Sequence, residues 1–302
     1  MKKVLFVRRR GLGLGSCKGL SRYLEENYRD QLLPIIWRTD RGFPVIPSEH
    51  GQEDTTLIRW GTTKSIAQPL GMVINKAEGI HRVNDKLGFQ AHLNTLDNQQ
   101  GILPSVTQYN IGEMLQQFTP TDQWVVRPRN HSRGRNLRVL TGQDMMSLLE
   151  STTQELYARP LVQKKAEYRA YLVNGRITTL AEKTPANPND IAWNVAQGGR
   201  FDVVRWGDWP LNVCKLACRI FPHTGLNFTG IDIMVDQEDQ AWFVEANSAP
   251  SLPALSEGSI SYRQECMAKG IAYSILEDNS HLTYETNNGW RGYVHPAIWS
   301  RD

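Results

Sequence analysis

A predicted hairpin around residue 239 places the strongest constraint on the fold of this chain. Two apolar runs, residues 227–236 and 241–250, flank the polar turn Gln237–Gln240, and this pattern predicts two antiparallel strands. If the turn closes symmetrically, three pairs of residues lie opposite each other: Asp236 with Ala241, Met234 with Phe243, and Asp232 with Glu245. Directly opposed residues have Cβ atoms about 4.5–5.5 Å apart, so the last pair brings together two like charges, which destabilise the sheet.

Asn247 extends this pair to three oxygen-bearing side chains. It lies two residues beyond Glu245 and therefore projects from the same face of its strand. Two carboxylates and an amide oxygen are ligands that a hard cation such as Mg²⁺ prefers. The alternative is a solvated face, because acidic residues are mostly exposed. Asp232 and Glu245 stand among Ile, Val and Phe residues and outside the turn, which favours the metal site.

Size and charge limit the class of protein. The chain has 302 residues, enough for two or three modules with a substantial core. Its net charge of +3 gives no general case for nucleic-acid or membrane binding. No apolar run approaches the about 20 residues of a membrane helix, and the first ten residues resemble an opening strand more than a secretory signal. We therefore expect a cytoplasmic protein without a membrane partner.

The cysteines agree with a reducing compartment. Cys17, Cys214, Cys218 and Cys266 show neither zinc-type nor disulfide-type spacing. A helix is predicted over about residues 211–221, with Gly225 near its exit. Two of the cysteines are four residues apart in this helix, so they share a face and are expected to pack as small apolar groups.

The remaining pattern predicts a mixed α/β protein. The first 75 residues contain the pieces of a small α/β unit: a first strand, the turn Gly11–Gly15, a helix around 18–26, and strands near 33–37 and 57–60. The pattern then predicts a helical segment from Lys76 to about Ala91, a strand at 124–127 and a helix over 143–156. A second hairpin joins 168–173 to 176–181 across Asn174-Gly175, a pair that suits a turn with two positive φ angles.

Two motifs allow more than one interpretation. Gly11-x-Gly13-x-Gly15 lies between a strand and a helix, where it forms a tight turn, accepts a substrate group or, less in keeping with its spacing, binds phosphate. The basic stretch Arg127–Arg138 indicates a nucleic-acid contact, a loop over nucleotide phosphates, or a solvated charged hairpin. From the residues alone these alternatives stay open.

Taken together, these segments resemble the ATP-grasp carboxylate–amine ligases, and most closely the branch that adds glutamate to a ribosomal protein tail. The strongest match is Gly230-Ile231-Asp232-Ile233 followed by residues 243–252. Residues 167–177, 193–199 and 74–86 are similar to the family's preceding hairpin, its Asn-to-Gly-Gly stretch and the helix that opens its ATP-binding region. The resemblance covers about residues 57–275.

This resemblance implies an α/β (α+β) architecture in which two α+β subdomains grip ATP. The implied domains are an N-terminal α/β domain at 1–75, subdomain A at 76–158, subdomain B with the metal site at 159–280, and a tail at 281–302. The implied metal ligands are Asp232, Glu245 and Asn247, and the implied catalytic residues are Arg169, Lys183 and Asn194. The implied nucleotide-binding residues are Arg127, Ser132, Gly134, Gln163, Lys164, Lys165, Glu167 and Lys183. Lys183 thus has both implied roles.

The implied activity is an ATP-dependent and Mg²⁺-dependent ligation, with Mn²⁺ as an alternative metal, that forms an amide bond through an acyl phosphate. The substrates would be a small-molecule or peptide carboxylate and an amine, or a macromolecular acceptor, and the chain would form a dimer or tetramer. Two alternatives remain: a degenerate ATP-grasp protein that binds nucleotide as a regulatory signal, and a basic protein associated with nucleic acid. The chain departs from the family in two places. Arg127 ends the Val-Val strand, where the family usually has a lysine, and the two side chains are not equivalent. The phosphate-covering loop is rich in glycine in the family, whereas only Gly134 remains among arginines here.

Overall fold

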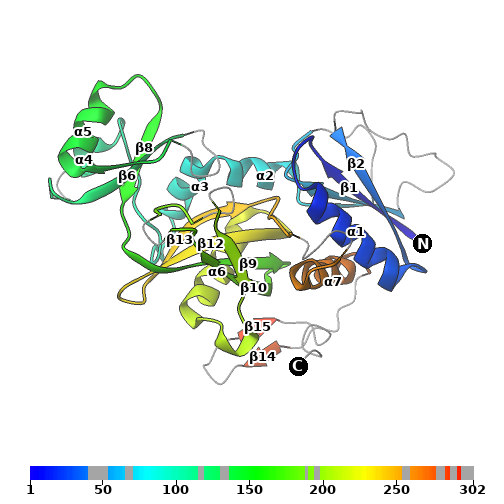
Figure 1. Ribbon diagram of the computed structural model, residues 1–302. Coiled ribbons are helices and arrows are strands. Elements are labelled where there is room, and N and C mark those ends of the chain that lie inside the picture. The colour runs from blue at the N-terminus through cyan, green and yellow to red at the C-terminus, as the bar shows by residue number, and fades with distance from the viewer. Residues whose placement is uncertain are drawn as a thin grey trace.

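The computed structural model describes residues 1–39, 54–64, 71–114, 119–129, 136–187, 190–193, 198–253, 259–276, 283–285 and 291–293. Within these ranges the strands form three larger sheets and a two-stranded ribbon. Figure 1 shows the N-terminal sheet on one side of the molecule, the central sheet in the middle, and the third sheet on the opposite side.

Parallel strands form the N-terminal sheet in the order β2-β1-β3-β4. Its elements are β1 (Lys2–Arg8), α1 (Leu14–Tyr28), β2 (Leu32–Arg38), β3 (Thr55–Trp60) and β4 (Met72–Ile74). One face of the sheet, with Val4 and Phe6, packs against Leu20 and Leu24 of α1. The predicted small α/β unit is therefore present, and its helix begins four residues earlier than predicted because Gly13 starts it in a left-handed conformation (φ 64°).

The central sheet is antiparallel and has the order β11-β10-β9-β12-β13. Its strands are β9 (Lys164–Val173), β10 (Arg176–Thr184), β11 (Arg200–Val203), β12 (Phe228–Asp236) and β13 (Ala241–Asn247). Asn174 and Gly175 both have positive φ angles, 47° and 81°, which is what a type I′ turn requires. The predicted Asn-Gly hairpin is thus confirmed.

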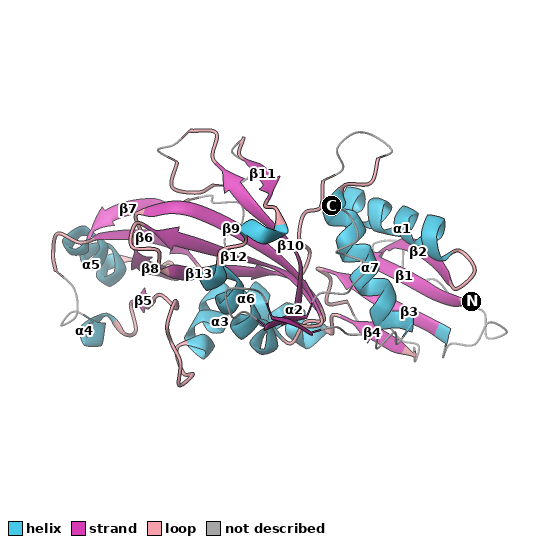
Figure 2. Ribbon diagram, turned by 90° about the horizontal axis from the view of Figure 1, so that it is seen from below, coloured by secondary structure: helices cyan, strands magenta, loops and turns pink. Residues whose placement is uncertain are grey.

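Side-chain alternation gives the central sheet two different faces. Helices α2 (Ala77–Asn84), α3 (Lys86–Leu93) and α6 (Leu211–Thr224) lie along one face, below the sheet in Figure 2. Ile231, Ile233 and Val235 of β12 belong to the core on that side. On the opposite face, α7 (Tyr262–Leu276) covers one end of the sheet, near Val173 and Phe228. The rest of that face carries charged side chains, and the candidate functional site lies there.

The third sheet has the order β5-β8-β6-β7. Its elements are β5 (Val106–Thr107), α4 (Ile111–Met114), β6 (Gln123–Pro128), β7 (Arg138–Thr141), α5 (Gly142–Ser151) and β8 (Leu156–Pro160). The helix predicted over 143–156 is too long, because Thr152 is already extended (ψ 144°) and Leu156 starts a strand. Three short elements complete the description: η6 (Trp206–Asp208), β14 (Thr283–Glu285) and β15 (Arg291–Tyr293).

The hairpin of β12 and β13 closes differently from the symmetric prediction. Asp236 and Gln240 close the turn through the Asp236 N–H, which donates to the Gln240 carbonyl at 3.1 Å, so that only three residues remain in the loop. The observed pairs are Val235 with Ala241, Met234 with Trp242, and Ile233 with Phe243. The predicted pairs Asp236–Ala241 and Met234–Phe243 are therefore wrong by one residue. The reason is the Asp236 carboxylate, whose Oδ1 accepts the N–H groups of Glu238 and Gln240 and tightens the turn.

A β-bulge then restores the predicted pairing further along the hairpin. The register shifts between Ile233 and Asp232, so Val244 has no partner on β12, and Asp232 lies opposite Glu245. Without this extra residue, Val244 would face Asp232, and Glu245 would project from the other side of the sheet. The bulge is therefore what brings the two carboxylates to one face.

Helix α6 ends at Gly225, as predicted, with Gly225 in a left-handed conformation (φ 67°). The four cysteines are free thiols. Cys214 and Cys218 lie on α6 and are largely shielded from water, and burial raises the pKa of Cys218 to about 11. These thiols are therefore packing groups, as predicted. Among the described residues, no helix has the length and apolar character needed to span a bilayer.

Asn75 fastens the N-terminal sheet to the central sheet. It follows β4, is fully buried and has a positive φ of 60°. Its Oδ1 accepts the N–H groups of Asn227 (2.8 Å) and Phe228 (3.0 Å), and its Nδ2 donates to the Phe228 carbonyl (3.0 Å). In return, the Asn227 Oδ1 accepts the Asn75 N–H at 2.9 Å. This exchange fixes the start of β12 beside the start of α2.

We predict that Asn75→Gly lowers the free energy of unfolding by about 2–4 kcal/mol, because three side-chain hydrogen bonds are lost and the partner groups of β12 stay buried. Urea denaturation measures the change. Glycine keeps the positive φ, so Asn75→Ala should cost still more. A matched control is Asn136→Gly, which removes another asparagine of positive φ (57°) from an exposed position. Equal losses for Asn75→Gly and Asn136→Gly would contradict the assigned role.

Candidate active site

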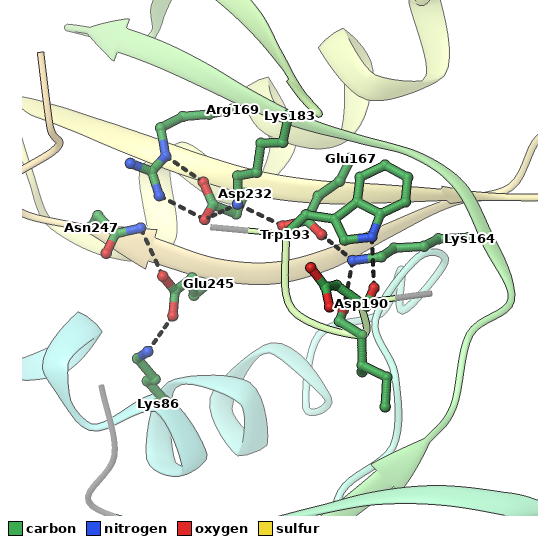
Figure 3. Close-up of polar contacts among 11 residues, drawn as sticks. Lys86, Lys164, Glu167, Arg169, Lys183, Asp190, Trp193, Asp232, Glu245 and Asn247 are labelled. Carbon is green, nitrogen blue, oxygen red and sulfur yellow. Dashed lines mark hydrogen bonds and ion pairs between the residues drawn. The ribbon is translucent and has the colours of Figure 1, made fainter. Parts of the chain in front are cut away.

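A cavity of about 440 Å³ lies between the charged face of the central sheet and the third sheet. Its volume falls in the range of small-ligand sites. Six lysine or arginine side chains and four carboxylates line it, so the wall carries a surplus of positive charge. The cations are Lys86, Arg127, Arg159, Lys164, Arg169 and Lys183, and the acids are Glu167, Asp190, Asp232 and Glu245. Figure 3 shows eight of these charged groups together with Trp193 and Asn247.

Asp232 is the centre of the network, with 2% of its surface exposed. Arg169, its partner on the neighbouring strand, donates from Nε to Oδ1 at 2.6 Å and from Nη2 to Oδ2 at 2.8 Å. Lys183 donates to the same Oδ2 at 2.6 Å. Burial alone would lower the pKa of Arg169 and of Lys183, but the Asp232 carboxylate raises both. Both cations therefore stay charged although they are largely buried.

Glu167 connects this centre to the mouth of the cavity. Its Oε1 accepts from Lys183 at 2.6 Å, and its Oε2 accepts from Lys164 at 2.5 Å. The Lys164 ammonium also donates to the Ile191 carbonyl at 2.8 Å and lies 4.4 Å from the centre of the Trp193 ring. Burial lowers the pKa of Lys164, although Glu167 opposes this shift. The described part of the 185–193 loop is thus tied to the cavity through one lysine.

Glu245 forms the second half of the site. Lys86, at the start of α3, donates to its Oε2, and the Asn247 Nδ2 donates to its Oε1 at 3.1 Å. Burial would raise the pKa of Glu245, but the Lys86 ammonium, with help from Lys183 and Arg169, holds that pKa well below its ordinary value. Asp232 and Glu245 are therefore two carboxylates in register, each compensated by cations from other elements.

Gly230 allows this close packing. It lies on the same face of β12 as Asp232, and a Cβ at this position would stand 2.9 Å from the Pro250 Cβ and 3.2 Å from the Arg169 Cδ. Such distances force neighbours to move, so a larger residue would disturb the packing of Pro250 and of the Arg169 side chain. The packing around the Gly-Ile-Asp motif therefore favours glycine.

The third sheet supplies two arginines and part of an apolar wall. Arg127 ends the Val-Val strand, and Arg159 lies opposite Val125 on the neighbouring strand. Burial lowers the pKa of Arg159 to about 10, and the charge of Arg127 adds to this shift. The Nε of Arg159 donates to the Ser105 hydroxyl at 3.1 Å. Apolar side chains complete the wall: Leu103, Val125, Leu137, Leu161, Val162, Met234 and Phe243.

The structure brings most of the predicted site residues into this cavity. Those that line it are Arg127, Gln163, Lys164, Glu167, Arg169, Lys183, Asp232 and Glu245. Asn247 joins through its hydrogen bond to Glu245. The Lys165 side chain is not part of the lining and pairs with Asp239 of the hairpin turn at 2.5 Å. Ser132, Gly134 and Asn194 lie outside the described residues.

Lys86 and Arg159 were not predicted as site residues, although the sequence holds a signal for each. Lys86 follows Asp85, whose side chain caps α3 by accepting the Gly88 N–H. A cation in the first turn of a helix opposes the helix dipole, so a lysine there indicates an outside partner. Arg159 lies within Leu156–Pro160, a strand whose other residues are apolar, and a buried charge of this kind needs an explanation.

The arrangement suits a multiply charged anion together with a hard cation. The surplus of cations would bind phosphate groups, and Asp232, Glu245 and Asn247 offer oxygen ligands of the kind that Mg²⁺ prefers. Within the described ranges no group of three or more His, Cys, Asp and Glu side chains could hold a metal ion. The candidate set is consistent with this finding, since it has only two carboxylates and takes its third oxygen from an amide.

Comparison with known proteins identifies the fold. No family model matches the chain, and no curated protein matches it. Among solved structures, an ATP-grasp ligase associated with RiPP peptides from Chryseobacterium gregarium, in complex with ADP and a leader and core peptide, matches with a TM-score of 0.64 at 13% identity, covering 92% of this chain and 97% of that one.

Two further structures agree. The macrocyclase MdnC from Microcystis aeruginosa MRC, bound with the precursor peptide MdnA, matches with a TM-score of 0.58 at 15% identity over 88% of this chain and 98% of that one. The D-alanine–D-alanine ligase from Bacillus anthracis, complexed with ATP, gives 0.57 at 12% identity over 92% and 97%. At these identities the likeness establishes the fold. The chain therefore has the ATP-grasp fold, and the predicted fold class is confirmed.

We predict that Lys86→Met lowers the free energy of unfolding of the metal-free protein at pH 7 by about 1–3 kcal/mol, because a largely buried Glu245 carboxylate loses its cation. The folded pKa of Glu245 is depressed, so this contribution is present above the unfolded value of about 4.3 and is lost as pH falls below it. The difference between Lys86→Met and the parent should therefore shrink from pH 7 to pH 3.5, measured by urea denaturation.

Lys165→Met is the matched control, because it removes a lysine from the exposed pair with Asp239. Its effect should stay below about 1 kcal/mol. A penalty for Lys86→Met that matches this control, or that does not change with pH, would contradict the assigned interaction.

Proposed function

We propose that this ATP-grasp chain is an ATP-dependent carboxylate–amine ligase that forms an amide bond through an acyl phosphate and requires Mg²⁺. The observation that carries the proposal is the Asp232–Glu245 pair, in register on one face of the central sheet and set in a cavity with surplus positive charge. Each solved structure named above is that of a ligase or a macrocyclase. The resemblance to the branch that adds glutamate to a ribosomal protein tail is part of this proposal.

The proposed reaction has two steps. In the first, a substrate carboxylate oxygen attacks the γ-phosphorus of ATP, the bond to the β–γ bridging oxygen breaks, and ADP leaves with the bond electrons. In the second, an amine attacks the carbonyl carbon of the acyl phosphate, inorganic phosphate leaves, and the nitrogen loses a proton to solvent. Positioning and charge neutralisation supply most of the catalysis in phosphoryl transfer. The six cations of the cavity wall suit that task.

Lys86, Lys183 and Arg169 would change partners when the nucleotide binds. In the free protein they neutralise Glu245 and Asp232. Mg²⁺ held by Asp232, Glu245 and Asn247 would neutralise phosphate charge and polarise the γ-phosphate. Lys86 and Lys183 then have a phosphate oxygen available in place of a carboxylate. The internal ion pairs thus hold these cations close to where the phosphates would lie.

The adenine ring would occupy the apolar part of the cavity. Leu161 and Val162 lead into β9, and the main chain of residues 163–165 offers N–H and carbonyl groups beside them. Arg127 would meet phosphates from the third sheet, and Ser132 and Gly134 would belong to the covering loop. Asn194, next to Trp193, would join the phosphate shell. A closed cavity keeps water from the acyl phosphate, which would otherwise hydrolyse.

The substrate classes follow from the reaction and from the neighbours. A small-molecule or peptide carboxylate and an amine are the proposed substrates. The peptides bound in two of the similar structures make a peptide acceptor the leading choice. A macromolecular acceptor, a homodimer or homotetramer, and a cytoplasmic location are retained as proposals. The free, buried thiols suit a reducing compartment.

A regulatory nucleotide-binding protein is the second candidate, and Arg127 favours it, because an arginine stands where the family usually has lysine. Nucleotide binding without turnover would support it. A nucleic-acid-binding protein is the third. It predicts retention on RNA or DNA that falls steeply with salt. In the described structure Arg127 lies in the cavity wall, and Arg129 pairs with Asp85 at 3.0 Å, so neither forms an open basic surface.

We predict that Asp232→Asn and Glu245→Gln each reduce ATP-dependent ADP release by about 10²–10³-fold, because a metal ligand and its charge are lost while the side-chain volume is kept. The assay supplies Mg²⁺, ATP and pools of amino acids and acidic peptides. Asp239→Asn, in the exposed hairpin turn, is the matched control and should keep parental turnover. Parental activity in both site variants would remove the metal assignment.

A second test addresses the intermediate. We predict that hydroxylamine, added in place of the amine substrate, yields a hydroxamate of the acid substrate in an amount equal to the ADP released, since a strong nucleophile captures an acyl phosphate. The ferric hydroxamate absorbance measures the product. ADP release with neither hydroxamate nor amide product would show hydrolysis of ATP and count against the proposed intermediate.

A further inference from the structure

Arg263 is a buried cation for which the described structure provides no counter-ion. It lies in the first turn of α7, only 7% of its surface is exposed, and its Nη1 has no hydrogen-bond partner. A buried guanidinium without a carboxylate is strongly unfavourable. Its position makes this worse, because the start of a helix disfavours positive charge. The charge of Arg263 therefore favours an anionic ligand that binds beside it.

The nearby acids are already engaged. Glu265 accepts from Lys269 at 3.1 Å. The hydrogen bond from Arg200 and, to a smaller extent, the charge of Arg263 lower the pKa of Asp202. The Asp202 Oδ2, however, already accepts from Arg200 at 2.8 Å and from Thr184 at 3.0 Å. Its side chain is also half exposed. No ion pair joins either acid to Arg263 within the described ranges.

Phe201 connects Arg263 with the active site. It is the register partner of Lys183 and lies on the same face of the central sheet. The Arg263 Cζ lies 5.6 Å from the centre of its ring, the Arg169 Cζ 4.9 Å, and the Lys183 Nζ 5.7 Å. Three cations thus surround one aromatic ring. Asp232 neutralises two of them, whereas the Nη1 of Arg263 has no hydrogen-bond partner.

We infer that Arg263 binds the carboxylate of the acid substrate, with Phe201 as the surface on which its guanidinium rests. The inference builds on the proposed ligase function. The guanidinium would donate two hydrogen bonds to the substrate carboxylate, a pairing that suits its planar geometry. Arg169 and Lys183, which contact the same ring, belong to the cavity where the γ-phosphate is expected. The bound carboxylate would therefore lie close to the phosphate that it attacks.

The anchoring of α7 supports this role. Ser261 and Gln264 form a capping box, in which the Ser261 Oγ accepts the Gln264 N–H (3.3 Å) and the Gln264 Oε1 accepts the Ser261 N–H (2.8 Å). The Gln264 Nε2 also donates to the carbonyls of Leu252 (2.9 Å) and Gly15 (3.3 Å). These bonds tie the start of α7 to the chain just after β13 and to the N-terminal glycine turn. Arg263 is thus held on a rigid support.

The test is calorimetric titration of the full-length protein, loaded with Mg²⁺ and a non-hydrolysable ATP analogue, with glutarate as the carboxylate probe. We predict that Arg263→Met weakens glutarate binding at least about tenfold while nucleotide affinity stays within about twofold. Arg263→Lys should recover part of the loss. Arg200→Met, which removes the neighbouring exposed arginine, is the matched control and should leave both affinities unchanged.

The melting temperature separates a binding role from a structural one. Without ligand, Arg263→Met should melt at the parental temperature or higher, because an uncompensated buried charge is removed; a lower melting temperature would indicate a structural role and overturn the inference. The inference is also overturned if the parent does not bind glutarate, or if Arg263→Met binds it normally. A preference for inorganic phosphate over glutarate at Arg263 would overturn the inference as well. ADP release, measured in parallel, distinguishes the two proposals. Glutarate binding that depends on Arg263 but is accompanied by no turnover would contradict the ligase function and leave the carboxylate site standing.

Discussion

The pairing of Asp232 with Glu245 is the interaction on which the site depends. Two carboxylates in register on neighbouring strands repel each other. Asp232 is buried, and the Glu245 side chain is only 20% exposed. Arg169 and Lys183 compensate the first, and Lys86 compensates the second. These cations come from two strands and one helix, so the central sheet and α3 must be assembled before the pair becomes tolerable.

This requirement explains several features that are otherwise unrelated. The bulge at Val244 is needed because the tight turn after Asp236 would direct Glu245 to the wrong face. Gly230 is needed because the Arg169 side chain passes directly over it. The contact of Asn75 with the start of β12 fixes the position of α2, and through it the position of Lys86 in the next helix. Each of these features serves the placement of charge.

Much of the arrangement of the candidate site is predictable from the sequence, for local reasons. The Asn174-Gly175 hairpin is specified by the turn residues themselves, and the pairing of the two carboxylates follows from strand alternation. The turn register was wrong because the side-chain hydrogen bonds of Asp236 decide it, and the bulge compensated for that error. A symmetric closure thus gave the right carboxylate pair with two wrong neighbouring pairs.

The residues that sequence reasoning missed are those whose partners are distant along the chain. Lys86 meets Glu245 across 159 positions, and a lysine at a helix start ordinarily reads as a solvated charge. Arg263 becomes informative only when the structure shows that it is buried beside Phe201 without a counter-ion. Burial and pairing of a charge depend on tertiary packing, which composition and periodicity do not encode.

A crystal structure of the protein with a non-hydrolysable ATP analogue and Mg²⁺ tests the central claim most directly. The account predicts a metal ion bound by oxygens of Asp232 and Glu245, with the Lys86 and Lys183 ammonium groups moved from these carboxylates onto phosphate oxygens. A nucleotide bound elsewhere, or one bound in the cavity with both carboxylates still paired to their lysines and no metal between them, would contradict it.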